Sequence, residues 1–469
     1  MYPVRRFRRS ALAVPTAAAL LAVACASAPP AASPVASSRA VPVDSVLALL
    51  TFDSAWSRIA TTHYDTAYGG VDWPGVRAEL RPGAAAAGTL GGLRDVLDDM
   101  LGRLGESHFV VIPREAADAL AGDDRGAGPV SGDAGLLVRL VGDDMAVWRV
   151  DAGGPAGAAG IEPGWVVVAA GGREFAPRIA ALRALPDADQ RTALTRLLYQ
   201  ANGQLAGEAG KVVRLRLRDA DGAEVERDVV LRETPGEVVR FGNLPPVIAS
   251  LRHDRIPTAT GCAGLIRLNV WVVPLVPSFD RAVDAVRDCH GVVIDLRGNP
   301  GGVAGMVMGT AGHFLEDTLA LGFMRTRTAE LRFKANPRRV RADGSPVRPY
   351  DGPLAILVDE MTASTSEFFA AGLQAVGRSR VFGTASAGQA LPALMVRLPT
   401  GDVLMHVIAD FTGPGGVRIE GRGVLPDVPV RSTLDDLRSG RDAPLQAALD
   451  WFAGTGGTGN THTGGSTHD

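Results

Sequence analysis

The sequence predicts a multidomain α/β protein, and three observations support that class. The chain has 469 residues, enough for about three domains at ~150 residues each. Hydrophobic residues make up 46% and charged residues 21% of it, which is ordinary for a globular chain. Three regions of different pattern follow one another: a helix-rich region over 42–125, short strands over 127–236, and alternating strands and helices over 237–436.

The charge composition restricts both partners and chemistry. The net charge of −3 gives no bulk attraction to nucleic acid or to an anionic membrane. The chain contains two lysines, Lys211 and Lys334, and nearly all of its positive charge is arginine. Few lysine side chains are therefore candidates for a catalytic base.

Residues 1–25 have the pattern of a secretory signal peptide. Four arginines precede an apolar run over 11–24, which is too short to cross a ~30 Å bilayer core comfortably. The run ends in "LLAVAC", so Cys25 is a candidate for lipidation, as in a bacterial lipoprotein, and ordinary Ala-x-Ala cleavage is the alternative. We expect an exported protein, periplasmic or anchored through a lipidated Cys25. Residues 26–41 are predicted to be a disordered linker, and 437–469 a C-terminal helix with a disordered tail.

Export implies an oxidising compartment, which gives the remaining two cysteines a possible role. Cys262 and Cys289 each come just before an apolar, strand-like run. If those strands are parallel neighbours, both cysteines lie at the same edge of the sheet and a disulfide can form. Two buried free thiols are the alternative.

The first two regions differ in the period of their apolar residues. "VDSVLALLTFDSAWSRIATTHY" carries apolar residues at helical spacing, and "GGLRDVLDDMLGRLG" does so up to a glycine stop. The region over 127–236 instead contains the short strand runs "GLLVRLV", "MAVWRV" and "KVVRLRLRD" around a glycine-rich centre.

The third region alternates strands with helices. The apolar runs "LIRLNVWV", "VVIDLR", "LAILVD" and "RVFG" are separated by predicted helices around 278–288, 303–315 and 366–376. This order is typical of a largely parallel sheet with helical crossovers. A predicted hairpin, "PALMVRLPTGDVLMHVIADF", turns at "TGD".

Ser364 is the first candidate for chemistry, because it lies where the strand run "LAILVD" gives way to a helix. Ser364 and Glu367 form the S-x-x-E pattern of a capping box, so the plain interpretation is a helix cap. A helix N-terminus also offers free N–H groups and a positive dipole to a developing oxyanion. The position therefore suits a nucleophile if partners exist.

Three further segments are weak signals when taken alone. "VVIDLRGNPGG" leaves the backbone N–H groups of Gly301 and Gly302 uncovered, which suits an oxyanion or simply a turn. It lacks the GxxxxGK[ST] pattern, which disfavours nucleotide binding. Ser107 and His108 lie in a loop after a helix, and Glu420 lies between glycine-rich turns. Histidine is the side chain best suited to act as a base near neutral pH.

Together these segments resemble the C-terminal processing (tail-specific) serine peptidases, in particular the tricorn-like branch. The resemblance covers about 50–435 and includes "LDDMLGRLGESHF", "GVVIDLRGNPGG" and "TASTSEFFAAGLQAVGRSRVFGTASAG". It implies a helical N-terminal domain, a PDZ-like domain over the middle region and a ClpP/crotonase-like α/β catalytic domain. The PDZ-like segment departs from the family by carrying Trp165 where aspartate is common.

The resemblance assigns roles residue by residue. Ser364 matches the family's nucleophile, but the lysine that serves as base in one branch corresponds to Gln389 here, and an amide is not a base at pH 7. The tricorn-like branch uses a Ser-His-Ser-Glu tetrad instead, which Ser364, His108, Ser107 and Glu420 supply. His108 would take the proton from Ser364. The oxyanion would accept hydrogen bonds from the N–H of Thr365 and from that of Gly301 or Gly302.

Together with the signal-like N-terminus, the resemblance implies an exported serine endopeptidase that hydrolyses peptide bonds in proteins or peptides, and no cofactor or metal is expected. It further implies substrates bound by their C-termini at the PDZ-like domain and is compatible with a homo-oligomer; nucleic acid is not expected as a partner. A catalytically inactive, PDZ-containing protein that binds peptide or lipid is the alternative. A generic α/β-hydrolase is disfavoured because G-x-S-x-G is absent around Ser364.

Overall fold

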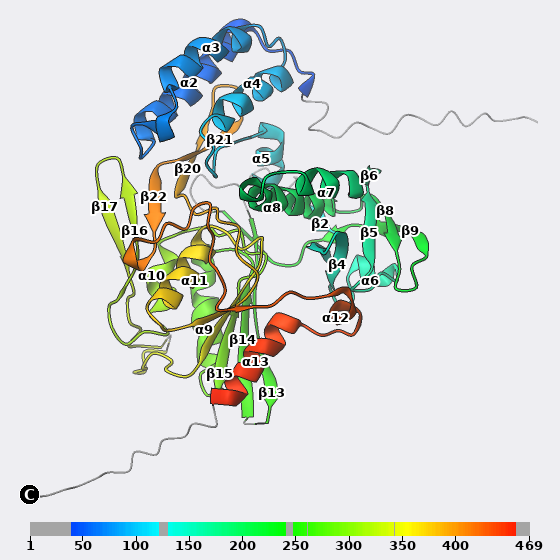
Figure 1. Cartoon of the computed structure of the whole chain (residues 1–469), viewed down its shortest axis with the longest axis vertical. Helices are drawn as coiled ribbons and strands as arrows, with labels where there is room; N and C mark the ends of the chain where they lie inside the picture. The colour runs from blue at the N-terminus through cyan, green and yellow to red at the C-terminus, as the bar shows by residue number, and fades with distance from the viewer. Residues whose placement is uncertain (1–38, 122–129, 241–246, 260, 342, 456–469) are drawn as a thin grey trace, which may run out of the picture.

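The computed structural model describes residues 39–121, 130–240, 247–259, 261–341 and 343–455. The predicted signal peptide, Cys25, most of the linker and the C-terminal tail lie outside these residues. Figure 1 shows the order of the parts: a group of helices at one end, a mixed middle domain at one side, and an α/β domain that ends in α13. The predicted multidomain α/β class is confirmed.

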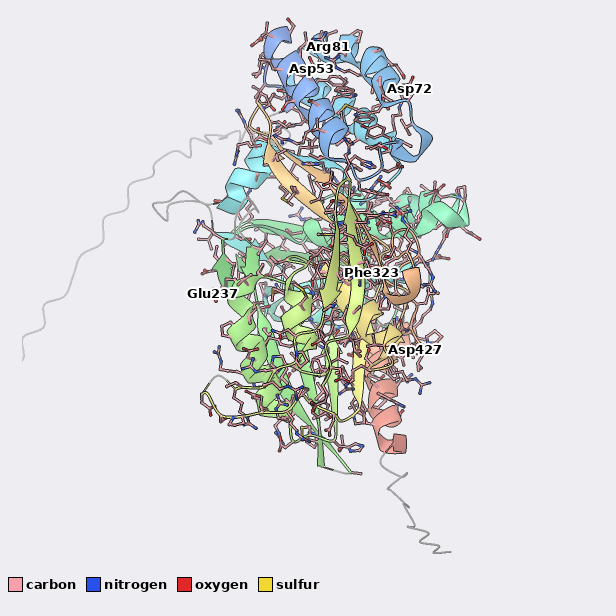
Figure 2. The ribbon with its side chains drawn as sticks, turned by 90° about the vertical axis from the view of Figure 1, so that its left-hand side faces the viewer. Asp53, Asp72, Arg81, Glu237, Phe323 and Asp427 are labelled. Atoms are coloured by element: carbon pink, nitrogen blue, oxygen red, sulfur yellow. A yellow bond between two sulfur atoms is a disulfide. The ribbon has the colours of Figure 1, made fainter. Side chains whose placement is uncertain are left out.

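The N-terminal helices pack around a core of their own. They are α2 (Ser45–Thr62), α3 (Trp73–Ala85) and α4 (Leu90–Gly102). Each starts at a capping side chain; Thr89, for example, accepts the N–H of Gly92 at the start of α4. Arg81 on α3 pairs with Asp53 on α2 across the outer surface of this group (Figure 2). Apolar faces turned inward and polar pairs outside are what the helical spacing predicted.

A strand from the N-terminal region joins a hairpin of the α/β region. The strands involved are β1 (Val110–Ile112), β20 (Ala393–Arg397) and β21 (Val403–Val407). The helix α5 (Arg114–Ala121) follows β1 in the chain. β1 pairs antiparallel with β21, which pairs with β20 across the predicted turn. Leu398 and Leu404 belong to the core of the N-terminal helices. The region predicted as helical is therefore bound to the α/β region through a shared sheet.

The middle domain contains a five-stranded antiparallel path in the order β3-β4-β5-β8-β9. Its strands are β3 (Leu136–Val141), β4 (Asp144–Val150), β5 (Val166–Ala170), β8 (Val212–Arg218) and β9 (Glu224–Val230), with β6 (Arg173–Glu174) beside β5. Its helices are α6 (Pro155–Ala158), α7 (Ala176–Arg183) and α8 (Asp187–Gly203). A smaller sheet has β2 (Ser131–Asp133) between β7 (Ala206–Glu208) and β10 (Arg232–Glu233). Trp165 is buried in the core of this domain.

The α/β domain is built on a six-stranded sheet in the order β13-β14-β15-β18-β19-β23. The strands are β13 (Leu251–Thr258), β14 (Gly261–Leu268), β15 (Gly291–Asp295), β18 (Leu354–Val358), β19 (Arg380–Gly383) and β23 (Val428–Pro429). β13 is antiparallel to its neighbour and the other pairs are parallel. A hairpin precedes it, formed by β11 (Glu237–Val239) and β12 (Val247–Ala249).

Helices cover both faces of this sheet. α9 (Val276–Val286), α10 (Met306–Ala311) and α11 (Thr365–Ala375) pack on one face, and α13 (Ala443–Thr455) packs on the other. All five residues of β18 are buried, as the continuous apolar run "LAILV" predicts for a strand covered on both sides. A separate sheet has β16 (Ala320–Thr326) between β17 (Glu330–Lys334) and β22 (Ala409–Thr412), and α12 (Leu434–Arg438) precedes α13.

The α/β domain contains the predicted disulfide and a shorter helix than the one predicted over 303–315. A disulfide joins Cys262 and Cys289, whose Cα atoms are 4.9 Å apart at the starts of the parallel neighbours β14 and β15. The helix expected over 303–315 is shorter, because the N–H of Val303 is bonded to the carbonyl of Trp271 and the turn continues to Gly305. Within the described residues, no helix combines the length and apolarity needed to cross a bilayer.

Candidate active site

Ser364 lies at the carboxyl end of the sheet, between β18 and α11. Its backbone has φ 53° and ψ −120°, a conformation that a residue with a side chain rarely adopts. Ser364 is partly exposed, whereas its neighbours Ala363 and Thr365 are buried. Strained backbone of this kind persists only where the surroundings force it, and it is concentrated at functional sites.

Glu367 is the group that holds the backbone of Ser364. Its Oε2 accepts the N–H of Ser364 at 2.9 Å and that of Gln389 at 3.1 Å, and its Oε1 accepts the N–H of Gly388 at 2.8 Å and the hydroxyl of Ser386 at 2.5 Å. The N–H of Ser364 also bonds to the carbonyl of Gln389 at 2.8 Å. One fully buried carboxylate therefore ties the helix start to the segment that carries Gln389.

Burial raises the pKa of Glu367 to about 7, although the hydroxyl of Ser386 and the N–H groups act in the opposite direction. The nearby carboxylate of Glu420 adds to the increase in pKa. The sequence pattern predicted the cap that Glu367 makes, but it did not predict that the carboxylate is buried or that four donors converge on it.

The glycine-rich turn over 296–302 supplies one side of the site. The N–H of Gly301 is committed to the side chain of the buried Asn299 at 2.9 Å. Among the described residues, the N–H groups of Gly302 and Thr365 have no hydrogen-bond acceptor. Those two N–H groups, and not that of Gly301, are available to an oxyanion.

Both glycines are required by the local packing. A Cβ on Gly301 would lie 2.7 Å from the Cβ of Ser364, and a Cβ on Gly302 would collide with the carbonyl oxygen of Trp271. Both residues have positive φ, 102° and 142° respectively. Gly301 thus allows the turn to pass close to Ser364, and Gly302 allows it to pass close to Trp271.

Ser107, His108 and Glu420 form a connected group. The Oγ of Ser107 lies 2.7 Å from Nδ1 of His108 and donates to Oε2 of Glu420 at 3.0 Å. The N–H of Ser107 donates to Oε1 of Glu420 at 3.0 Å, across a separation of 313 residues. Because the hydroxyl proton is directed to Glu420, Ser107 accepts from His108, which assigns the ring proton to Nδ1 and leaves a lone pair on Nε2.

The backbone of His108 is also unusual, with φ 61°. His108 and Ser364 are two of the three residues other than glycine with positive φ among those described. Partial burial of the imidazole lowers the pKa of His108 to about 4, so the ring is neutral at pH 7. Burial raises the pKa of Glu420, against the effect of its bonds from Ala390 and Ser107.

The loop that carries His108 is held by contacts with the segment around Glu420. Glu106 accepts from Tyr64 at 2.6 Å and from Arg418 at 3.3 Å. Arg418 and Glu420 therefore bind consecutive residues of the loop, Glu106 and Ser107. The pairing of β1 with β21 begins two residues after His108 and brings the two segments together.

Hydrogen bonds connect the two halves of the site. Oε2 of Glu420 accepts the N–H of Ala390 at 2.7 Å, and the preceding carbonyl, that of Gln389, accepts the N–H of Ser364. The position where one branch of the resembled family has lysine thus supports the site through its backbone. None of the hydrogen bonds among the described residues joins His108 directly to Ser364, which is common before substrate binds.

Comparisons with known proteins match two regions of the chain to known domains. Residues 263–430 match peptidase family S41, and residues 51–102 match the tricorn protease C1 domain. The chain is 25% identical over 399 residues to "Carboxyl-terminal-processing peptidase 3, chloroplastic" of Arabidopsis thaliana, with 82% of this chain and 69% of that protein covered. It is 26% identical over 413 residues to "Tricorn protease homolog 1" of Streptomyces coelicolor, covering 84% of this chain but 34% of that protein.

A solved structure supports the fold as a whole. The photosystem II D1 C-terminal processing protease superposes with a TM-score of 0.54 at 21% identity, covering 86% of this chain and 96% of that one. The fold and the matched domains define a serine-type peptidase. Within that class, the chain contains a peptidase family S41 domain and a tricorn protease C1 domain.

Proposed function

We propose that this chain hydrolyses peptide bonds in proteins or peptides, with Ser364 as the nucleophile and His108 as the base. The observation that carries the proposal is the group in which Ser107 joins His108 to Glu420, connected through Ala390 and Gln389 to Ser364. The members come from four separate segments of the chain, around residues 107, 364, 389 and 420. A helix cap alone needs none of these contacts.

The mechanism follows from the positions of donors and acceptors. Ser364 Oγ attacks the peptide carbonyl carbon while Nε2 of His108 takes the hydroxyl proton. The N–H groups of Gly302 and Thr365 donate to the oxyanion of the tetrahedral intermediate, where one such donor is worth about 3 kcal/mol. His108 then protonates the leaving amine, and water releases the acyl group by the same steps in reverse. Ser107 orients the imidazole, and Glu420 orients Ser107.

The test is covalent labelling by a fluorophosphonate probe combined with peptide cleavage. We expect the wild-type chain to be labelled and to cleave, Ser364→Ala to do neither, and His108→Ala to be labelled far more slowly. His253→Ala is the matched control, because His253 is exposed on β13, outside the site. Equal labelling of Ser364→Ala and the wild type would contradict the proposal.

We also propose that the chain is exported and anchored by lipid at Cys25. The pattern of residues 1–25 supports this part of the proposal. In a bacterial host, the full chain should incorporate labelled fatty acid and fractionate with membranes, and Cys25→Ser should abolish the label. Retention of unprocessed protein in the cytoplasm would contradict export, whereas processing without lipid would support Ala-x-Ala cleavage.

A further inference from the structure

The groove between β3 and α8 of the middle domain is where the PDZ resemblance implies that a substrate C-terminus binds. Binding there proceeds by strand addition, in which an extended peptide pairs with the free N–H and C=O groups of an edge strand. β3 is an edge strand of its sheet, with β4 on one side and α8 near the other. Strand addition therefore requires unpaired backbone groups on the α8 side of β3.

Those backbone groups are already paired at the centre of β3. The N–H of Val138 donates to Oδ1 of Asn202 at 3.0 Å, and Nδ2 of Asn202 donates to the carbonyl of Val138 at 3.1 Å. Asn202 lies in the last turn of α8, and its Nδ2 also donates to the carbonyl of Leu198 at 2.8 Å. One amide side chain thus bridges strand and helix directly, in the space that an added strand would need.

The groove also contains a side chain from the α/β domain. Met361, which comes three residues before Ser364, is 6% exposed and belongs to the hydrophobic cluster of the middle domain. That cluster includes Val138 of β3 and Leu198 of α8. Sδ of Met361 lies 3.8 Å from Nδ2 of Asn202. The apolar position of the groove is therefore filled by the chain itself.

The backbone beside Met361 is bound to α8 as well. The hydroxyl of Tyr199 donates to the carbonyl of Met361 at 3.3 Å, and that of Thr195 donates to the carbonyl of Glu360 at 2.9 Å. Arg191, one turn before Thr195, donates to the carbonyl of Ser386 at 3.0 Å. One face of α8 thus lies along the segment that precedes the nucleophile and bonds to its backbone.

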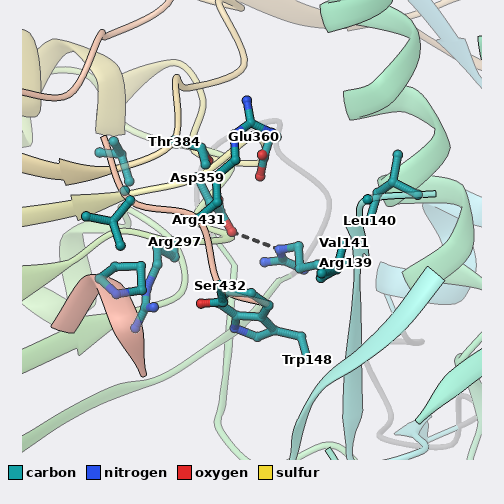
Figure 3. A pocket seen from close by; sticks show the side chains of 15 residues that line it. Arg139, Leu140, Val141, Trp148, Arg297, Asp359, Glu360, Thr384, Arg431 and Ser432 are labelled. Carbon is teal, nitrogen blue, oxygen red and sulfur yellow. Dashed lines mark hydrogen bonds and ion pairs between the residues drawn. The ribbon is translucent and has the colours of Figure 1, made fainter. Parts of the chain in front are cut away.

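A buried ion pair fixes the same segment to β3. Nε of Arg139 lies 2.8 Å from Oδ2 of Asp359, and both side chains are buried. Oδ1 of Asp359 accepts the N–H of Gly298 at 2.8 Å and that of Met361 at 3.1 Å. Figure 3 shows Arg139 directed at Asp359 beside Leu140 of β3, and the cavity left at this junction is about 60 Å³. Asp359 therefore connects β3, the glycine-rich turn and the nucleophile segment.

We propose that the middle domain is a fixed support for the nucleophile segment: its groove holds the chain's own Met361, and substrates are cleaved without capture of their C-terminal carboxylate there. The part that concerns cleavage rests on the proposed peptidase function. The part that concerns the groove does not, since it can be measured on a protein that cannot cleave. Met361 and Arg139 are positioning residues, because they act on Ser364 and Gly302 through the backbone.

Peptide binding tests the groove without catalysis. The full chain carrying Ser364→Ala is titrated with a fluorescent peptide that ends in an apolar residue with a free carboxylate, and with the same peptide as an amide. We expect no saturable change in anisotropy that distinguishes the two peptides up to about 1 mM. Saturable binding of the free acid that the amide lacks would overturn the proposal.

Substrate preference tests the consequence for cleavage. Two internally quenched peptides that differ in a free or an amidated C-terminus should give kcat/KM values within about twofold of each other. A preference of about tenfold or more for the free acid would overturn the proposal. If neither peptide nor any protein is cleaved, the proposed function fails, while the binding result still decides the state of the groove.

Hydrogen exchange tests the supporting role with a matched pair of methionine variants. Met361→Ala should accelerate amide exchange about tenfold or more in both 195–203 and 359–366, and should lower kcat with little change in KM. Met145→Ala removes another buried methionine of the same cluster, on β4, and should leave exchange over 359–366 unchanged. If Met361→Ala changes neither segment, or if Met145→Ala accelerates 359–366 equally, the supporting role is wrong.

Discussion

The nucleophile and its proposed base are held in contrasting ways. Ser364 lies between a fully buried strand and a buried helix, and Glu367, only three residues away, holds its backbone. His108 lies on a loop whose partners, Arg418 and Glu420, come from more than 300 positions further along the chain. The nucleophile is therefore prepared locally, whereas the base is delivered by docking of the N-terminal region.

This contrast predicts different kinds of failure. Changes around Ser364 should damage chemistry and stability together, because the same buried groups carry both. Changes around His108 should reduce kcat while the α/β core stays folded, because the loop contributes little buried surface to that core. Substitutions in the two regions should therefore be distinguishable by their effects on stability and on kcat.

Gly302→Ala should have the largest effect in the nucleophile region. The added methyl group would collide with the carbonyl of Trp271 and move an N–H group that is available to the oxyanion. We expect kcat to fall about 10²- to 10³-fold, the range found when one oxyanion donor is lost. Steady-state kinetics measures the change.

Gly305→Ala is the control for that substitution, because an added Cβ there meets nothing within 4 Å. It should leave kcat within about twofold of the wild type. Normal kcat in Gly302→Ala would show that another donor serves the oxyanion.

Among substitutions around His108, Ser107→Ala should cause the clearest loss of activity. It removes the hydroxyl that accepts from Nδ1 of His108 and donates to Glu420, so the ring loses its orientation. We expect kcat/KM to fall about 10²-fold, as misplacement of a catalytic group by about 1 Å can cause. The thermal midpoint should change by less than about 2 °C, since Ser107 is partly exposed.

The restoring variant for this experiment is Ser107→Thr, which keeps the hydroxyl. It should recover most of the lost activity. If Ser107→Ala instead lowers the thermal midpoint strongly and Ser107→Thr does not restore kcat/KM, the group is structural and His108 needs no orienting partner.

Glu367→Gln should reduce stability and activity together. The new amide nitrogen would face two donors that now share one carboxylate oxygen, and both would lose that acceptor. The N–H of Ser364 would still have the carbonyl of Gln389. We expect the free energy of unfolding to fall by about 2–3 kcal/mol, from the cost of buried donors left unpaired, and kcat to fall about tenfold. Denaturant unfolding and kinetics on the same preparation measure both.

Asp435→Asn is a suitable control for the loss of one carboxylate charge, because Asp435 is exposed on α12. It should leave both quantities unchanged within error. A Glu367→Gln variant with full stability would mean that water replaces the lost acceptor.

Much of the nucleophile region could be predicted from the sequence, because its signals are local. The apolar run of β18, the helix start at Ser364 and the S-x-x-E pattern all lie within 14 residues. The strands predicted directly after Cys262 and Cys289 are the parallel neighbours β14 and β15. Strand and cap signals depend on neighbours in the chain, so they survive in a sequence without a structure.

The contacts that the sequence could not predict depend on partners distant in the chain. Nothing near Val138 indicates that Asn202, 64 positions away in the chain, pairs with its backbone. The pairing of β1 with β21 likewise joins two short strands whose patterns do not specify each other. Such contacts arise from tertiary packing, which leaves no periodic signal in the sequence.

The pH profile of kcat/KM should contain two separate steps, one from His108 and one from Glu367. The step from Glu367 is the smallest change in activity that we expect. His108, with its pKa lowered to about 4, is a neutral base down to about pH 4, so the loss of kcat/KM that it causes should lie well below the usual range near 6.5. Glu367, with its pKa raised to about 7, takes up a proton below that pH and releases one of its donors. This second change should lower kcat/KM by about two- to tenfold near pH 7, because it alters positions and leaves the reacting groups in place.

The two steps respond to different substitutions. Glu367→Gln should remove the step near pH 7 and keep the fall near pH 4, because the amide does not titrate and His108 is unchanged. The two groups should change the free energy of unfolding in opposite directions with pH. Because the pKa of His108 is lowered, the protein should lose stability as pH falls from 6.5 to 4. Because the pKa of Glu367 is raised, the protein should lose stability as pH rises from 4.5 to 7. A single limb near pH 6.5 that persists in Glu367→Gln would mean that His108 titrates as an exposed histidine, and the docked loop would then not shield the base as the contacts of Ser107 and Glu420 imply.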